Sequence, residues 1–133
     1  LGVSALRGVS VQIVLPSAPN LKIVQWAGAA LLWQVLSPGC KVYLTPEPFD
    51  HTKLLIVDRH YLLLGSSNWD PRSLRLNFEL NVECYDQALA QAVAELVQAR
   101  IAQARELTLA DVDGRSLPVR LRDGLARLLS PYL

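Results

Sequence analysis

The sequence predicts an α/β fold in which strands form a sheet and helices cover it. Segments with strand-like alternation or continuous apolar runs are interleaved with segments of helical periodicity, as in layered α/β proteins. The chain has 133 residues, of which 51% are hydrophobic and 19% are charged. That length and composition are typical of a compact globular domain with its own core. We therefore expect a single domain over residues 1–133.

Glycine and proline residues divide the chain into the expected elements. Gly8 closes the first helix, and Pro38-Gly39 stop the second, which Asn20 is expected to cap. The expected strands cover residues 10–15, 41–44, 53–57, 61–64 and 78–85. The expected helices cover residues 1–7, 20–36, 87–106 and 119–129. Turns are expected at residues 59–60 and 70–73, the second with a short helix as its alternative.

The net charge is close to zero. With 13 Lys or Arg and 12 Asp or Glu, the chain carries +1 at pH 7. No global field therefore points to nucleic acid or to an anionic membrane. This charge weakens a nuclease interpretation without excluding it, since a local basic patch is enough to bind nucleic acid.

The two cysteines and the ends of the chain say little about function. Cys40 and Cys84 form neither a CxxC pair nor a cluster with histidine, so we expect buried free thiols rather than zinc ligands or a disulfide. The chain has no methionine and no signal-peptide pattern, which we interpret as an excised domain. The longest apolar run, around Trp26 to Leu36, is broken by Gln34 and is too short to span a bilayer. Any membrane anchor of the parent protein is expected outside these residues.

The segment His51-Thr52-Lys53, at the start of the third expected strand, is the first candidate for chemistry. Side chains alternate along a strand, so His51 and Lys53 point to the same face. This pair suits a phosphate group, because an imidazole can attack phosphorus or move a proton while an ammonium neutralises the oxygens. Asp58 lies past the strand end with the other parity, where we expect it to orient the structure by hydrogen bonds.

A small polar loop follows the fourth expected strand. Gly65 lets the backbone turn sharply or approach closely, and Ser66 and Asn68 offer uncharged donors to phosphate oxygens. Glu79 begins the next strand after an apolar lead-in. We expect its carboxylate to reach the far nitrogen of His51, where it would fix the tautomer and stabilise the imidazolium.

The combined pattern HxKx4Dx6GSxN is far more specific than its parts. A histidine with a lysine two residues later is commonplace, but the fixed spacing to the polar loop is improbable on composition alone. The pattern resembles the HKD signature of the phospholipase D superfamily. The continuation from Asn68 to Asn81 resembles the second HKD region of bacterial cardiolipin synthases, which lies in their C-terminal half. Residues 5–9, 24–26 and 128–131 agree too, so the resemblance covers essentially the whole chain.

The resemblance implies a phospholipase D-like mixed β-sheet flanked by helices, which forms one half of a pseudo-twofold, two-domain enzyme. The active site of the family combines two HKD motifs. One histidine becomes a phosphohistidine, and the other protonates the leaving alcohol and then activates the acceptor. Carried onto this sequence, the catalytic residues are His51, Lys53, Asp58 and Glu79, and the phosphate-binding residues are Lys53, Ser66 and Asn68.

The chain contains only one HxK, because His60 is followed by Leu62 rather than by lysine. We therefore expect half of an active site. A second HKD half in the same polypeptide, or a second copy of this chain, would complete it. The resemblance implies no metal and no other cofactor.

The implied activity is that of a phosphatidyl transferase, which makes cardiolipin from phosphatidylglycerol. The parent protein is expected at the cytoplasmic side of the bacterial inner membrane, with this chain alone soluble. Three alternatives stay open: a phospholipase D-type phosphodiesterase, a homodimeric nuclease with a single HKD motif, and an inert scaffold. The low net charge and the stretch from Asn68 to Asn81 argue against nucleic acid.

Several conspicuous side chains are not assigned to the site. We interpret His60 as a turn residue. Trp26 and Trp33, seven residues apart on one expected helix, are interpreted as core. Trp69 adjoins the polar loop, and we leave it open between the surface and the substrate entrance.

Some arginines are interpreted as surface charges rather than lipid ligands. Arg72 and Arg75 follow the polar loop, where a contact with a second lipid phosphate is the alternative. The last helix carries Arg120, Arg122 and Arg127 beside four leucines. We expect this helix to dock on the core, with a membrane surface as its alternative.

Overall fold

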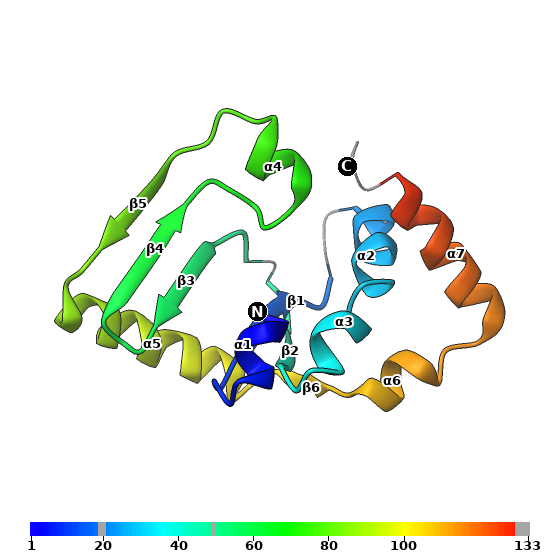
Figure 1. Cartoon of the computed structure of the whole chain (residues 1–133), viewed down its shortest axis with the longest axis horizontal. Coiled ribbons are helices and arrows are strands. Elements are labelled where there is room, and N and C mark those ends of the chain that lie inside the picture. Colours follow the sequence, from blue (N-terminus) through cyan, green and yellow to red (C-terminus); the bar gives the residue numbers. More distant parts are fainter. Residues whose placement is uncertain (19–20, 49, 130–133) are drawn as a thin grey trace. The chain divides into compact units, whose positions relative to one another are not determined.

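The computed structural model describes residues 1–18, 21–48 and 50–129, apart from the side chains of Pro71 and Arg72, and it confirms the α/β class (Figure 1). The chain forms two compact units, Leu1–Phe49 with Gln103–Leu133, and Asp50–Ala102. The first unit holds α1 (Gly2–Leu6), β1 (Gln12–Pro16), α2 (Lys22–Ala29), α3 (Trp33–Leu36), β2 (Lys41–Thr45), β6 (Arg105–Leu107), α6 (Leu109–Asp113) and α7 (Leu117–Leu128). The second unit holds β3 (Lys53–Val57), β4 (Tyr61–Gly65), α4 (Pro71–Arg75), β5 (Asn81–Cys84) and α5 (Gln87–Ile101).

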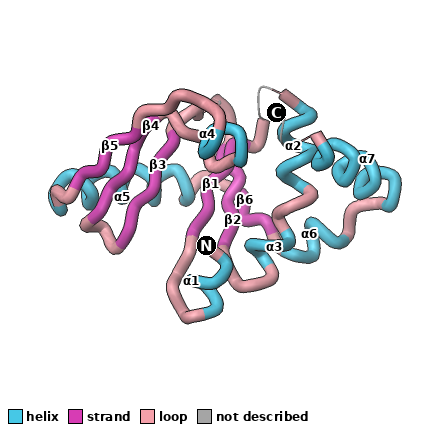
Figure 2. Tube along the Cα trace, turned by 45° about the horizontal axis from the view of Figure 1, so that its top comes forward, coloured by secondary structure: helices cyan, strands magenta, loops and turns pink. Residues whose placement is uncertain are grey.

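The first unit is built on a mixed sheet of strand order β1-β2-β6 (Figure 2). β1 runs parallel to β2, and β6 runs antiparallel to β2. The core cluster consists of Val42 on β2, Leu107 on β6 and Val112 on α6, and each of these side chains is buried. Apolar side chains of β1, α3 and β2 pack around the cluster. The expected mixed sheet is therefore confirmed.

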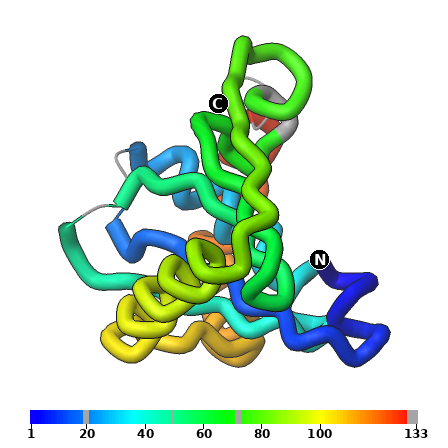
Figure 3. Tube along the Cα trace, turned by 90° about the vertical axis from the view of Figure 1, so that its left-hand side faces the viewer, coloured from blue at the N-terminus to red at the C-terminus, as the bar shows by residue number. Residues whose placement is uncertain are grey.

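The second unit is built on an antiparallel sheet of order β3-β4-β5. Helix α5 packs against β4 and lies on one side of the sheet (Figure 3). Leu62 of β4 and Ala90 and Ala94 of α5 are buried. Because neighbouring strands run in opposite directions, the start of β3, the end of β4 and the start of β5 share one end of the sheet.

A tight turn joins β3 to β4, one residue earlier than the turn expected at Arg59-His60. The backbone N–H of His60 donates to the carbonyl oxygen of Val57 at 3.0 Å. Asp58 and Arg59 have φ angles of 51° and 52°. Positive φ at both central positions is typical of a type I′ hairpin turn, whose twist matches that of the strands. Aspartate tolerates this conformation better than most residues do.

The helix expected over residues 20–36 is divided into α2 and α3. Its expected cap, Asn20, lies outside the described residues. Between the two helices the N–H of Leu31 donates to the carbonyl oxygen of Gly28 at 2.9 Å, which is an i→i−3 bond in place of a helical i→i−4 bond. Gly28 has low helix propensity, which favours an interruption at this point.

Strand pairing shortens two other expected elements. The helix expected to reach Glu106 ends at Ile101, because Arg105–Leu107 forms β6 and pairs with β2. The strand expected over residues 78–85 is confined to β5, which is the part that pairs with β4. In both cases tertiary pairing overrides the local pattern.

The structure also shows the state of the two cysteines, the grouping of metal-ligating side chains and the length of the apolar helices. Cys40 is buried and Cys84 is partly buried, and both are free thiols. Across the described ranges, no three His, Cys, Asp or Glu side chains gather as a group that could hold a metal ion. Among the described helices, none combines the length and the apolar character that crossing a membrane requires.

Candidate functional site

The candidate site lies in the second unit, at the end of the sheet where β3 begins and β4 ends. The strand register brings the relevant segments together, because Lys53 pairs with Gly65 and Gly65 pairs with Asn81. Five of the six predicted site residues lie on these segments. They are His51, Lys53, Ser66, Asn68 and Glu79.

A hollow of about 160 Å³ opens at this end of the sheet. Lys53, Ser67, Asn68 and Asn81 supply its polar lining, and leucines of β3, β4 and α4 supply the apolar part. Trp69, whose side chain is 59% exposed, also borders it. An ammonium group together with neutral amide and hydroxyl groups is a donor set that suits a phosphate.

Ser66 is not among the residues that line the hollow, and its hydroxyl is engaged with Glu79. Ser66 Oγ donates to Glu79 Oε2 at 2.5 Å, and the N–H of Leu80 donates to Ser66 Oγ at 3.1 Å. Asn77 Nδ2 donates to Glu79 Oε1 at 3.2 Å. Both carboxylate oxygens of Glu79 therefore accept hydrogen bonds within the loop. Its expected bond to His51 stays a prediction.

Hydrogen bonding keeps Glu79 ionised. The bond from Ser66 lowers the pKa of Glu79, and the bonds from Asn77 and Ser73 and the charge of Lys53 act in the same direction. A group whose folded pKa is lowered contributes stability above its ordinary pKa. That contribution is lost as the pH falls through the lowered value, so the loop is expected to be held most firmly at neutral pH.

Lys53 is half-buried at the start of β3. Its ammonium donates to the carbonyl oxygen of His51 at 2.7 Å. Burial lowers the pKa of Lys53, while the negative charges of Glu79 and Asp50 oppose that shift. The backbone carbonyl of His51 thus positions the Lys53 ammonium. The positive charge of Lys53 also lowers the pKa of Glu79.

The segment before β3 is fixed by an aspartate that the sequence analysis missed. Asp50 Oδ1 accepts bonds from the N–H and the hydroxyl of Thr52 at 2.9 and 2.5 Å, and Asp50 Oδ2 lies 3.4 Å from Arg100 of α5. The bonds from Thr52 lower the pKa of Asp50, as do the charges of Arg100 and His51. The pattern Asp-x-Thr, which is typical of an Asx turn, is the signal that could have identified it.

Ser67 and Asn81 are two further residues that motif spacing did not indicate. Asn81 Nδ2 donates to Ser67 Oγ at 2.9 Å, and the N–H of Ser67 donates to Asn81 Oδ1 at 3.4 Å. These bonds join the polar loop to the start of β5. They orient the loop that carries Asn68.

Asp58 lies apart from the other predicted site residues. It occupies the hairpin turn after β3 and is exposed. β3 spans five residues, so roughly 16 Å of extended strand separate Asp58 from the start of β3. This placement agrees with a structural part for Asp58 and leaves its catalytic assignment a prediction.

The interpretation of Trp26 and Trp33 as a shared core face was wrong. Trp26 lies on α2 and is half-buried, whereas Trp33 begins α3 and is 49% exposed. Because the helix is interrupted between α2 and α3, the two tryptophans do not share one helical face, on which the interpretation depended. Arg75 is exposed, as expected, and the side chain of Arg72 lies outside the described residues.

We expect Ser66→Ala to raise the pKa of Glu79 toward its ordinary value, because the largest cause of the lowering is the bond from Ser66. A carboxyl-carbon NMR titration of Glu79 measures this shift. Ser67→Ala is the matched control, since Ser67 bonds to Asn81 and not to Glu79. An unchanged pKa of Glu79 in Ser66→Ala would contradict the pairing.

Comparison with known proteins places these features in a family. Residues 1–101 match the family model described as the PLD-like domain of cardiolipin synthase. The chain belongs to this family. It is 35% identical over its whole length to cardiolipin synthase 1 of Staphylococcus epidermidis, and 37% identical over 98% of its length to a cardiolipin synthase of Staphylococcus aureus.

The family likeness extends to a solved structure. Nuc from Salmonella typhimurium, described as a phospholipase D family member, superposes with a TM-score of 0.66 at 25% identity. The match covers 81% of this chain and 70% of the Nuc chain. By contrast, the chain spans only 27% and 26% of the two staphylococcal relatives. This PLD-like domain therefore matches about a quarter of the length of each of these cardiolipin synthases.

Proposed function

We propose that this chain is one half of a phosphatidyl-transfer site that makes cardiolipin from phosphatidylglycerol. One observation carries the proposal. The single His-x-Lys of a cardiolipin synthase-type domain lies at the sheet end where Asn68 and Glu79 are also found. A complementary half, from the same polypeptide or from a second copy of the chain, supplies the other histidine.

The proposed chemistry is a double displacement at phosphorus. A ring nitrogen of one histidine attacks the phosphodiester, and the P–O bond to the leaving glycerol breaks as the second histidine gives that oxygen a proton. The hydroxyl of an acceptor phosphatidylglycerol then loses its proton to the second histidine. The oxygen of this acceptor hydroxyl attacks phosphorus, and the P–N bond to the first histidine breaks. His51 is one of these two histidines.

The neighbouring residues stabilise charge in this scheme. Lys53 and Asn68 border the hollow and bind the phosphate oxygens, on which negative charge develops in each transition state. Ser67 and Asn81 hold the loop in place, and Ser67 is a further candidate donor. The negative charge of the ionised Glu79 stabilises the positively charged imidazolium of His51, which is the role expected for Glu79 from the sequence.

Self-pairing of the chain is a second route to a complete site. The match to Nuc covers most of that chain, so a phospholipase D family member of similar length exists. This supports completion by a second copy. The near-zero net charge and the likeness to cardiolipin synthases favour a lipid over nucleic acid as the substrate of such a pair.

The test is cardiolipin formation by the isolated chain on phosphatidylglycerol vesicles, over a range of chain concentrations. We expect little or no product from the monomer, because one histidine cannot serve both sides of phosphorus. Activity that rises with the dimer fraction, measured by sedimentation, would assign completion to a second copy. Mass spectrometry separates cardiolipin from phosphatidate, the product of hydrolysis.

Two outcomes would contradict the proposal. Robust turnover by a strictly monomeric sample would exclude the half-site. Cleavage of single-stranded or duplex DNA by the dimer, without any conversion of phosphatidylglycerol, would assign the site to a nuclease. His51→Asn serves as the inactive control in every arm.

A further inference from the structure

Helix α7 of the first unit presents a continuous row of exposed leucines. One face of the helix packs against α2 and buries Asp123 and Ala126. On the opposite face, leucines recur with helical spacing, and each is at least 60% exposed. We call this row the leucine ridge; it consists of Leu117, Leu121, Leu125 and Leu128.

Two arginines hold the buried face of α7 through Asp123. Arg115 and Arg122 both bind the carboxylate of Asp123, at 2.5 and 2.7 Å. Arg115 also donates to the carbonyl oxygen of Ala29 at 3.1 Å. The guanidinium of Arg122 lies over the ring of Trp26, 4.4 Å from its centroid. Docking on the core, as expected from the sequence, therefore leaves four leucines in solvent.

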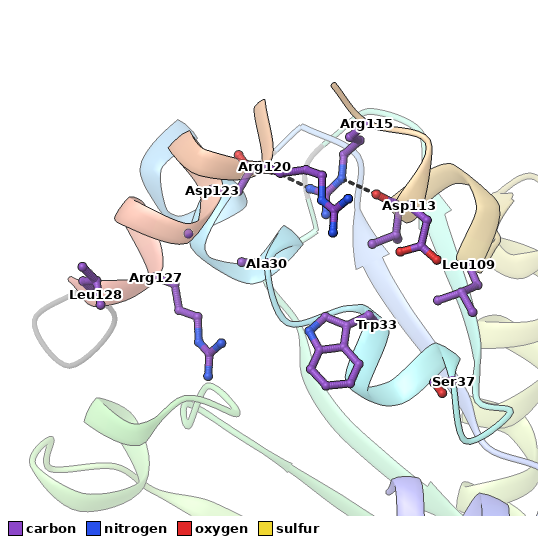
Figure 4. A pocket seen from close by; sticks show the side chains of 12 residues that line it. Ala30, Trp33, Ser37, Leu109, Asp113, Arg115, Arg120, Asp123, Arg127 and Leu128 are labelled. Carbon is purple, nitrogen blue, oxygen red and sulfur yellow. Dashed lines mark hydrogen bonds and ion pairs between the residues drawn. The ribbon is translucent and has the colours of Figure 1, made fainter. Parts of the chain in front are cut away.

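A large hollow of about 670 Å³ adjoins the ridge (Figure 4). Arg120 and Arg127, seven residues apart on one side of α7, line it together with the exposed Trp33. Within the described part of the chain, neither guanidinium has a hydrogen-bond or ion-pair partner. Gly124 lies between the two arginines, and the space above its α-carbon is open.

The charges around the hollow favour an anion. Three arginines and two aspartates line it, and one of these aspartates, Asp123, is already bound by Arg115 and Arg122. Asp113 is the other acidic group. At 100° per residue, Arg120 and Arg127 lie beside the ridge rather than opposite it. An apolar surface flanked by two guanidinium groups matches acyl chains beneath lipid phosphates.

We propose that α7 is a membrane-surface helix that binds bilayers containing anionic phospholipid. The leucine ridge enters the interface, and Arg120 and Arg127 bind lipid phosphates at the mouth of the hollow. A protein partner that covered the ridge would also have to supply anions to these two arginines, whereas a lipid headgroup layer supplies them at the required depth. This site lies in the first unit, and it acts independently of the HKD residues.

Cosedimentation of the 133-residue chain with vesicles tests the proposal. We expect binding to phosphatidylglycerol–phosphatidylcholine vesicles and much weaker binding to phosphatidylcholine alone. Arg120→Gln with Arg127→Gln should weaken binding to the anionic vesicles about 25-fold, at about fivefold for each arginine. Leu121→Gln with Leu125→Gln should weaken binding to both kinds of vesicle by about tenfold or more.

Matched controls separate this effect from general charge, exposure and catalysis. Arg7→Gln with Lys41→Gln removes the same charge from exposed positions elsewhere in the first unit, and Leu96→Gln removes an exposed leucine from α5. Both should bind like the unaltered chain, apart from a small effect of net charge. His51→Asn should also bind normally, so failure of the transfer chemistry would leave this result unaffected. Circular dichroism verifies that each variant is folded.

Three results would overturn the proposal. The first is equal binding by the ridge variant and the unaltered chain. The second is absence of vesicle binding together with self-association that Leu121→Gln and Leu125→Gln abolish, which would assign the ridge to a second copy. The third is saturation of Arg120 and Arg127 by soluble glycerophosphate, followed by NMR, in a chain that binds no vesicle.

Discussion

Replacing His51 with asparagine in the completed site should reduce cardiolipin formation by about 10³-fold or more. Whichever of the two parts His51 takes, asparagine can neither form a phosphorylated intermediate nor exchange a proton near neutral pH. His51 is exposed, so its replacement opens no cavity in the core. We therefore expect the thermal unfolding midpoint to stay nearly unchanged. Initial rates with labelled phosphatidylglycerol, beside an unfolding curve, measure both quantities.

Glu79→Gln distinguishes a chemical part for His51 from a merely structural one. Glutamine keeps one carbonyl oxygen, which can accept the bond from Ser66 or the bond from Asn77 but replaces only one of the two carboxylate oxygens that accept them, and it removes the negative charge. We expect a smaller loss of about 10²-fold, because the imidazolium that forms during the reaction loses the support of a negative charge. A His51→Asn enzyme that retained a tenth of its activity would contradict the assignment.

The expected fold was most accurate where the local sequence and the tertiary pairing agree. Gly8 and Gly39, both predicted stops, adopt φ angles of +87° and +101°, which side-chain-bearing residues rarely adopt. Agreement failed at β6, where an alanine-rich run predicts helix but Arg105–Leu107 pairs with the edge of β2. The periodicity of the local sequence cannot indicate that β2, much earlier in the chain, has an edge with which this segment pairs.

The candidate site divides in the same way. The sequence predicted a strand that begins at Lys53 and a polar loop that opens at Gly65, and the register of β3 and β4 agrees, with His51 two residues before β3. The bond between Ser66 and Glu79 was not predicted, because it depends on how the segment before β5 returns to the loop. Sequence spacing predicts which residues are candidates for the chemistry. It does not fix which of their polar atoms meet.

The last helix shows why amphipathic patterns need a structure. The sequence displays leucines and arginines on α7 but does not say which face meets the core. In the folded chain, Asp123 rather than a leucine is buried against α2, because Arg115 and Arg122 neutralise it. The ion-paired Asp123 therefore occupies the packing face of α7, and the leucine ridge is exposed to solvent.

Gly65→Ala should destabilise the site end of the second unit by about 3 kcal/mol. A methyl group at this position would lie 2.7 Å from the α-carbon of Asn81, and closer still to the carbonyl oxygen of Leu80 and to the side-chain oxygen of Asn81. Two of these three atoms belong to the backbone of the segment that β5 continues, so relief requires the β4–β5 ladder to separate. The same shift would break the bonds from Ser66 to Leu80 and from Asn81 to Ser67.

The consequence is a joint loss of stability and activity, with the unfolding midpoint lowered by roughly 10 °C and the amides of β4 and β5 exchanging faster with deuterium. Gly28→Ala is the matched control, because the space around Gly28 on α2 is open and alanine is the better helix former there; it should stabilise the chain by up to about 1 kcal/mol. If Gly65→Ala unfolded at the midpoint of the unaltered chain and kept full activity, the close approach of Leu80 and Asn81 to Gly65 would not be what holds the polar loop against β5.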